Sequence, residues 1–126
     1  MKLPSQLQLP SPQFQPPLKP FLRWAGGKSR IAKLLVNYVP GEYGRYWEPF
    51  LGSGALYFYL RPNKGYLADS NRALLDCYKN VRDFPEKVFN KLKEYARLTS
   101  EDHYYLIREL YNKSEPSISQ SARFIY

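Results

Sequence analysis

Residues 46–71 read YWEPFLGSGALYFYLRPNKGYLADSN, and this stretch decides the fold. A short aromatic run, Tyr46–Phe50, predicts a β-strand, and Gly52-Ser53-Gly54 turns the chain into a helix over Ala55–Leu60. Arg61-Pro62-Asn63 ends that helix, and Gly65–Asp69 predicts a second strand. A strand, a helix and a second strand within so few residues indicate right-handed parallel βα units. The sequence therefore predicts an α/β fold.

Helical patterns flank this stretch on both sides. Apolar residues recur at helical spacing over Ser29–Val39, and Pro40-Gly41 ends that pattern. Ser70 or Asn71 is suited to cap a helix whose apolar face holds Leu74, Leu75, Tyr78 and Val81. After Phe84 the pattern is helical throughout, and we expect helices to begin at Pro85, near Ser100 and near residue 119.

These changes in composition and in apolar periodicity divide the chain into three predicted parts. Residues 1–18 are rich in Pro, Gln, Ser and Leu and predict a disordered or polyproline-like tail. Residues 19–83 carry the glycine turns and the predicted βα units. Residues 84–126 form the helical part, and at 126 residues the chain is one domain or part of one.

Composition excludes several classes of protein. No apolar run approaches the length of a membrane span, and the N-terminus MKLPSQLQLP is not typical of a secretory signal. Cys77 is the only cysteine and His103 the only histidine, which excludes a disulfide framework and a Cys/His zinc site within one chain. A single cysteine suits a reducing cytosol, so we expect a cytoplasmic protein. Cys77 is expected in the core, and His103 on a helix surface or in packing.

The net charge of +8 is unevenly distributed along the chain. Residues 19–83 hold eleven Lys and Arg against five acids, whereas residues 84–115 hold six of each. An excess in the part that carries the glycine turns fits a polyanionic partner such as DNA or RNA. A basic solvated surface that serves solubility explains the same charge equally well.

The first glycine pair, in FLRWAGGKSR at residues 21–30, resembles a phosphate-binding loop only superficially. The G-x-x-x-x-G-K-[ST] pattern requires a glycine at position 22, where this chain has Leu22. The pair instead lets the backbone approach a ligand closely, while Trp24 can cover an aromatic or sulfonium group and Lys28 can reach a carboxylate. A helix-entry turn with Trp24 in the core is the structural alternative.

The second glycine turn precedes an acid that ends a predicted strand. A dinucleotide fingerprint would place Gly or Ala at position 57, where Tyr57 stands, so a pyrophosphate cofactor is disfavoured. A nucleoside without phosphates needs only the close backbone approach that Gly52 and Gly54 allow. Asp69 is suited to bind ribose hydroxyls, or alternatively to cap the following helix. Glu48 is either an acid on the ligand side or a paired structural charge.

Three segments together resemble the Dam-type DNA adenine-N6 methyltransferases. FLRWAGGKSR resembles that family's N-terminal cofactor motif, EPFLGSGAL its first Rossmann motif, and LADSNRALLDCYKNV its acidic loop with the helix that follows. LYNKSEPSISQSARFIY resembles the helical entry into the family's target-recognition region. The resemblance runs from about Pro20 to Tyr126.

The resemblance implies a cofactor, a partner and a set of site residues. It implies an incomplete Rossmann-like, S-adenosylmethionine-dependent methyltransferase fold, followed by the start of a helical target-recognition insert. Residues 19–83 would bind S-adenosyl-L-methionine, and double-stranded DNA would be the substrate for methylation at adenine N6. The residues carried over to the cofactor are Trp24, Lys28 near the carboxylate, Phe50, Gly52 and Gly54 along the cleft, and Asp69 at the ribose.

One part of the family's pattern does not occur in these 126 residues. The family's catalytic Asp-Pro-Pro-Tyr loop has no counterpart, because the only Pro-Pro here is Pro16-Pro17, ahead of the cofactor motifs. We therefore expect an N-terminal fragment of a methyltransferase that is inactive alone. The alternative is a non-catalytic nucleic-acid-binding remnant, or half of a split enzyme whose catalytic loop is carried by a C-terminal polypeptide.

Overall fold

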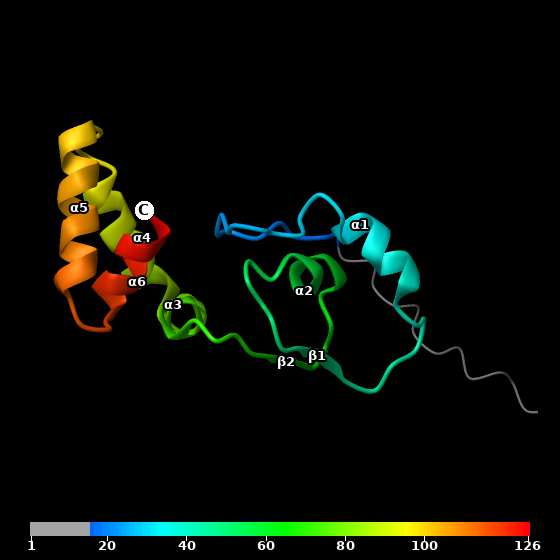
Figure 1. Ribbon diagram of the computed structural model, residues 1–126. Helices are drawn as coiled ribbons and strands as arrows, with labels where there is room; N and C mark the ends of the chain where they lie inside the picture. The colour runs from blue at the N-terminus through cyan, green and yellow to red at the C-terminus, as the bar shows by residue number, and fades with distance from the viewer. Residues whose placement is uncertain (1–15) are drawn as a thin grey trace, which may run out of the picture.

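A small parallel sheet lies at the centre of the first half of the molecule. The structure, a computed structural model, describes residues 16–126. Strand β1 (Tyr46–Glu48) pairs with β2 (Gly65–Leu67) in parallel, with Tyr46 opposite Gly65 and Glu48 opposite Leu67. Helix α2 (Ala55–Leu60) connects the two strands, and Figure 1 shows it lying over them. The predicted mixture of helices with a parallel sheet is confirmed.

Both strands are shorter than the sequence predicts. We expected strands over Tyr46–Phe50 and Gly65–Asp69, whereas regular pairing ends at Glu48 and Leu67. Tyr46 and Glu48 bond to the segment of β2, and regular alternation would place the next bond at Phe50, whereas it comes from Leu51. The two segments nevertheless stay together for two more bonds, because the Ala68 amide donates to the Glu48 carbonyl and the Leu51 amide donates to the Ala68 carbonyl, both at 2.9 Å.

The predicted helix over residues 29–39 is also shorter and changes type. It forms as α1 (Ala32–Leu35) followed directly by a 3-10 turn, η1 (Val36–Tyr38). Ala32 is buried, whereas Ile31, Leu34 and Tyr38 are exposed. Helix α1 contacts α2, so this segment covers the sheet-side helix.

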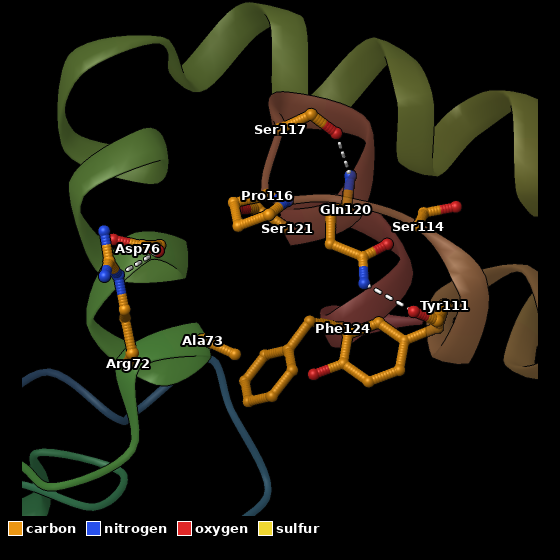
Figure 2. A pocket seen from close by; sticks show the side chains of 10 residues that line it. All are labelled: Arg72, Ala73, Asp76, Tyr111, Ser114, Pro116, Ser117, Gln120, Ser121 and Phe124. Carbon is orange, nitrogen blue, oxygen red and sulfur yellow. Dashed lines mark hydrogen bonds and ion pairs between the residues drawn. The ribbon is translucent and has the colours of Figure 1, made fainter.

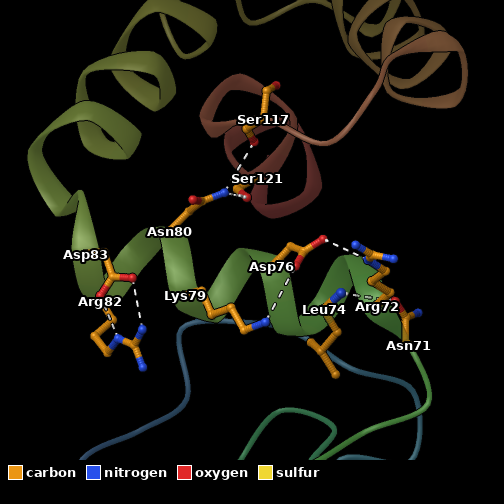
Figure 3. A network of polar contacts seen from close by, with 10 residues as sticks. All are labelled: Asn71, Arg72, Leu74, Asp76, Lys79, Asn80, Arg82, Asp83, Ser117 and Ser121. Carbon is orange, nitrogen blue, oxygen red and sulfur yellow. Dashed lines mark hydrogen bonds and ion pairs between the residues drawn. The ribbon is translucent and has the colours of Figure 1, made fainter.

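Helix α3 (Arg72–Asp83) links the sheet to the helical half. Asn71 caps it as predicted, since its Oδ1 accepts from the Leu74 amide at 3.0 Å. The remaining helices lie together beyond it in Figure 1 and are α4 (Pro85–Tyr95), α5 (Glu101–Lys113) and α6 (Ile118–Ile125). Figure 3 shows how α3 is fixed to α6: Asn80 donates to Ser121 Oγ at 2.8 Å and to the Ser117 carbonyl at 3.4 Å.

The core joins the N-terminal segment to α3. Leu22, Leu74 and Cys77 form its buried centre, and Leu74 and Cys77 have no exposed surface. Burial raises the pKa of the Cys77 thiol to about 12, so this cysteine acts as a small apolar side chain, as predicted. The side chains packed around this centre are Trp24, Tyr78, Val81, Phe124 and Ile125.

Of the predicted tail, residues 1–15 lie outside the described part of the chain. Pro16, Pro17 and Leu18 are exposed, and the Leu18 amide donates to the Phe58 carbonyl at 3.1 Å. Within residues 16–126, none of the helices is long and apolar enough to cross a membrane. The same residues bring no three His, Cys, Asp or Glu side chains together as a metal site.

Candidate functional site

Three segments that are distant in sequence meet around one cavity of about 200 Å³. Residues 24–28 form one side, residues that follow β1 form the second, and Asp69 after β2 completes it. The carboxyl ends of neighbouring parallel strands lie at one edge of a sheet, which is where such folds bind ligands. Five of the six site residues predicted from sequence line it: Trp24, Lys28, Phe50, Gly52 and Asp69.

Gly52 brings the backbone close to the Trp24 ring at the edge of the cavity. Its φ of +51° lies in the left-handed region, and a Cβ there would be 3.1 Å from Cδ1 of Trp24. The indole thus lies directly against the turn. Its other neighbour is the Phe124 ring, with centroids 5.9 Å apart. Trp24 therefore lines the cavity and packs against the core, so the two interpretations of this residue are compatible.

Gly54 is the one predicted site residue that does not line the cavity. It is buried, has a φ of +63°, and is the N-cap residue of α2. A Cβ at this position would lie 3.2 Å from both Leu51 and Phe58 side-chain atoms. Gly54 thus ends the glycine turn, and its left-handed backbone conformation begins α2.

Glu48 lies on the cavity, at the end of β1. Its Oε2 accepts from the Tyr46 hydroxyl at 2.7 Å. Burial raises the pKa of Glu48, while the Tyr46 hydrogen bond and the positive charge of Lys28 oppose that rise. An acid and a base therefore face one cavity, which suits a ligand that carries both a carboxylate and an ammonium group. The sequence left Glu48 open between an acid on the ligand side and a paired structural charge, and the structure shows it both on the cavity and bonded to Tyr46.

Asp69, which follows β2, is hydrogen-bonded to the glycine turn that follows β1. Its Oδ2 accepts from the Gly52 amide at 2.9 Å, and its Oδ1 accepts from the Asn71 amide at 2.9 Å. These bonds, with Asn71 first and Gly52 second, lower the pKa of Asp69. Each carboxylate oxygen has a second lone pair, so the same side chain can still accept from ligand hydroxyls. Asp69 thus supports the start of α3 and also faces the cavity.

A second cavity, of about 220 Å³, lies between α3 and α6 (Figure 2) and holds none of the predicted site residues. Its polar groups largely bind one another. Gln120 Nε2 donates to the Tyr111 carbonyl at 2.6 Å, its amide donates to Ser117 Oγ at 3.0 Å, and Arg72 pairs with Asp76. A site whose hydrogen-bonding groups are already satisfied has little to offer a ligand, so the smaller cavity is the stronger candidate site.

Comparison with known proteins agrees with this geometry. The family model described as D12 class N6 adenine-specific DNA methyltransferase matches residues 24–126, which include every residue of the cavity. The chain belongs to this family. The Dam-type resemblance read from the sequence is thereby confirmed.

Relatives of this D12-class chain include bacterial and archaeal methyltransferases. It is 36% identical over 91 residues to the type II methyltransferase M1.LlaDCHI of Lactococcus lactis subsp. cremoris, covering 72% of this chain and 32% of the relative. It is 33% identical to the type II methyltransferase M.MjaIII of Methanocaldococcus jannaschii, covering 86% and 44%. It is 30% identical to the DNA adenine methylase of Haemophilus influenzae, covering 90% and 41%. The chain thus spans only 32–44% of the length of these relatives.

Proposed function

We propose that the cavity at the ends of β1 and β2 binds S-adenosyl-L-methionine. The observation that carries this proposal is the meeting of Lys28, Glu48 and Asp69 around one cavity in a chain of the D12 class. Lys28 would bind the carboxylate of the methionine part and Glu48 its ammonium group. Asp69 would accept from the ribose hydroxyls, and the Trp24 ring would cover the sulfonium or the base.

We propose further that the whole protein transfers the methyl group to adenine N6 in double-stranded DNA. The bound cofactor supplies an electrophilic methyl group, and its transfer needs in-line placement of an amino nitrogen. A base in a duplex reaches such a site only when it leaves the stack. The residues around this cavity hold the donor, and we assign the acceptor site to an Asp-Pro-Pro-Tyr loop outside these 126 residues, on the same or a second polypeptide.

The sheet supports the view that a larger Rossmann-like fold is built on this part. Trp47 and Tyr66 stack on one face of the sheet, with ring centroids 4.2 Å apart, and are 62% and 46% exposed. Parallel sheets are normally covered on both faces. We propose that further strands and helices of the methyltransferase domain cover this face, and that residues 19–83 and 84–126 are the cofactor-binding part and the start of the target-recognition region. A cytoplasmic location belongs to the same proposal.

Charge favours DNA contact by the cofactor-binding half. Residues 16–64 hold eight Lys and Arg against two acids, and none of these eight forms an ion pair within the described chain. The five ion pairs of residues 16–126 all lie on α3, α4 and α5. Arg30 and Lys33 are exposed and three residues apart beside the glycine loop. Free cations near the cavity are suited to phosphates of a bound duplex.

Calorimetric titration of the chain with S-adenosylmethionine tests the cofactor assignment. Lys28→Ala should weaken binding about fivefold, since the exposed lysine contributes one ion pair. Lys87→Ala, an exposed lysine on α4, is the matched control and should leave affinity unchanged. ATP serves as a second ligand. Equal affinity for ATP, or equal binding by wild type and Lys28→Ala, would contradict the assignment.

DNA binding at several salt concentrations tests the surface. Neutralising Arg30 and Lys33 with glutamine should flatten the slope of log K against log salt by up to about 1.8, or about 0.9 for each phosphate that is no longer neutralised. The same change at Lys87 and Lys91 removes equal charge from α4 and should leave the slope as it is. DNA binding of this kind without cofactor binding would instead favour a non-catalytic nucleic-acid-binding protein.

A further inference from the structure

Tyr78, on α3, lies behind the glycine turn of the cavity. Its hydroxyl donates to the Gly52 carbonyl at 3.4 Å, and the Gly52 amide donates to Asp69 Oδ2 at 2.9 Å. Both polar groups of the Gly52 backbone are thus bound by residues on α3 or just before it. The turn has no other side-chain hydrogen bonds to α3 among the described residues.

The Tyr78 ring is held firmly. It packs edge-on against Phe21, with centroids 5.1 Å apart, and against Phe58 at 6.1 Å. The helix beneath it is fixed by Leu74 and Cys77, which have no exposed surface. Burial is also the main cause that raises the pKa of Tyr78, so the hydroxyl remains a donor. Its position is therefore set by the core and is independent of any ligand.

The orientation of the Gly52 carbonyl also determines where the next amide points. In a trans peptide the C=O of one residue and the N–H of the next point in opposite directions, and residues 16–126 contain no cis peptide. Tyr78 is not among the residues that line the cavity, whereas Ser53 is. The Ser53 N–H therefore points away from the Tyr78 hydroxyl, and Ser53 itself lines the cavity. It donates no hydrogen bond to any acceptor within the described chain.

We propose that Tyr78 is a positioning residue that orients the Gly52–Ser53 peptide so that the Ser53 N–H binds an oxygen of the ligand. This proposal rests on the proposed binding of S-adenosylmethionine. Tyr78 touches no ligand itself. It acts through one carbonyl, which keeps the peptide from rotating and leaves the Ser53 N–H without an acceptor among the described residues.

Tyr78→Phe tests this role because it removes one oxygen and keeps the ring. Affinity for S-adenosylmethionine, measured calorimetrically on the full chain, should fall about fivefold, the effect of one neutral hydrogen bond. Tyr95→Phe is the matched control, since Tyr95 is partly buried on α4 and its hydroxyl has no hydrogen bond to the described residues. In the labelled wild-type chain, the Ser53 amide resonance should shift on titration with the cofactor.

The outcomes separate the two proposals. If Tyr78→Phe lowers the melting temperature but binds within a factor of two of wild type, Tyr78 is only structural and the positioning role is refuted. If Tyr78→Phe does not fold, the wild-type Ser53 amide decides: a resonance that stays in place at saturating cofactor refutes the role. A wild-type chain that does not bind S-adenosylmethionine contradicts the proposed function itself, and the role of Tyr78 with it.

Discussion

Asp69→Asn separates the structural role of this carboxylate from its role in binding. The side chain accepts two backbone N–H groups at 2.9 Å, from Gly52 and Asn71, and asparagine keeps only one acceptor oxygen. Loss of one such bond reduces the free energy of unfolding by about 1 kcal/mol. For a domain of this size that lowers the melting temperature by roughly 4 °C.

The effect on binding is larger and specific to the ribose. A hydrogen bond from a hydroxyl to a charged acceptor contributes about 1.5–3 kcal/mol, or roughly 10- to 150-fold in affinity. Wild type should therefore prefer S-adenosylhomocysteine to its 2′-deoxyribose analogue by at least about tenfold. In Asp69→Asn this preference should shrink to about threefold or less.

Comparing two ligands on each protein removes the effect of stability, which is common to both titrations. Asp83→Asn, an exposed carboxylate at the end of α3, is the control and should keep the wild-type preference. If Asp69→Asn discriminates between the two ligands as strongly as wild type does, the carboxylate has only a structural role, as the acceptor for the Gly52 and Asn71 amides. The assignment of Asp69 to the ribose would then be wrong.

Three further changes test the site and the core. Gly52→Ala should reduce cofactor affinity by more than about tenfold and the free energy of unfolding by about 1–2 kcal/mol, because the alanine would have to adopt a left-handed φ beside the Trp24 ring. Gly41→Ala is the control: an added Cβ there meets no atom within 4 Å, so neither affinity nor stability should change. Burial raises the pKa of Glu48, so the folded state loses stability as pH rises and this carboxyl becomes charged. Glu48→Gln should therefore have a higher melting temperature than wild type at pH 7. It should also bind the cofactor more weakly. Leu74→Ala should lower the free energy of unfolding by about 2–5 kcal/mol in urea titrations, because this side chain has no exposed surface.

Local chemistry was sufficient to predict the order of elements. Asn71 and Ser100 cap α3 and α5 through their own side-chain oxygens, and Pro85 begins α4, as their residue types indicate. The two strands and α2 follow from the aromatic runs and the glycine turn. Strand ends were less predictable, because regular pairing ends at Glu48 while the chain remains bonded through Leu51, one residue beyond the position that alternation would give.

The candidate site was predictable as a set of residues but not as an arrangement. Trp24 and Asp69 were chosen from their neighbours in the sequence, yet only the fold places both against Gly52. Gly54 was predicted to line the cofactor cleft; it is the N-cap residue of α2 and is not among the residues that line the cavity. The contact between Tyr78 and Gly52 spans 26 residues and depends on the packing of α3, which no local pattern encodes.

Mapping S-adenosylmethionine onto the labelled chain by backbone amide shifts tests the central claim most directly. The account predicts saturable changes at three separate segments, Gly26–Lys28, Leu51–Ser53 and Asp69–Asn71, which meet only at the cavity beside β1 and β2. Changes confined to Ser114–Ser121, around the larger cavity between α3 and α6, would contradict it. So would a spectrum that does not change at saturating cofactor.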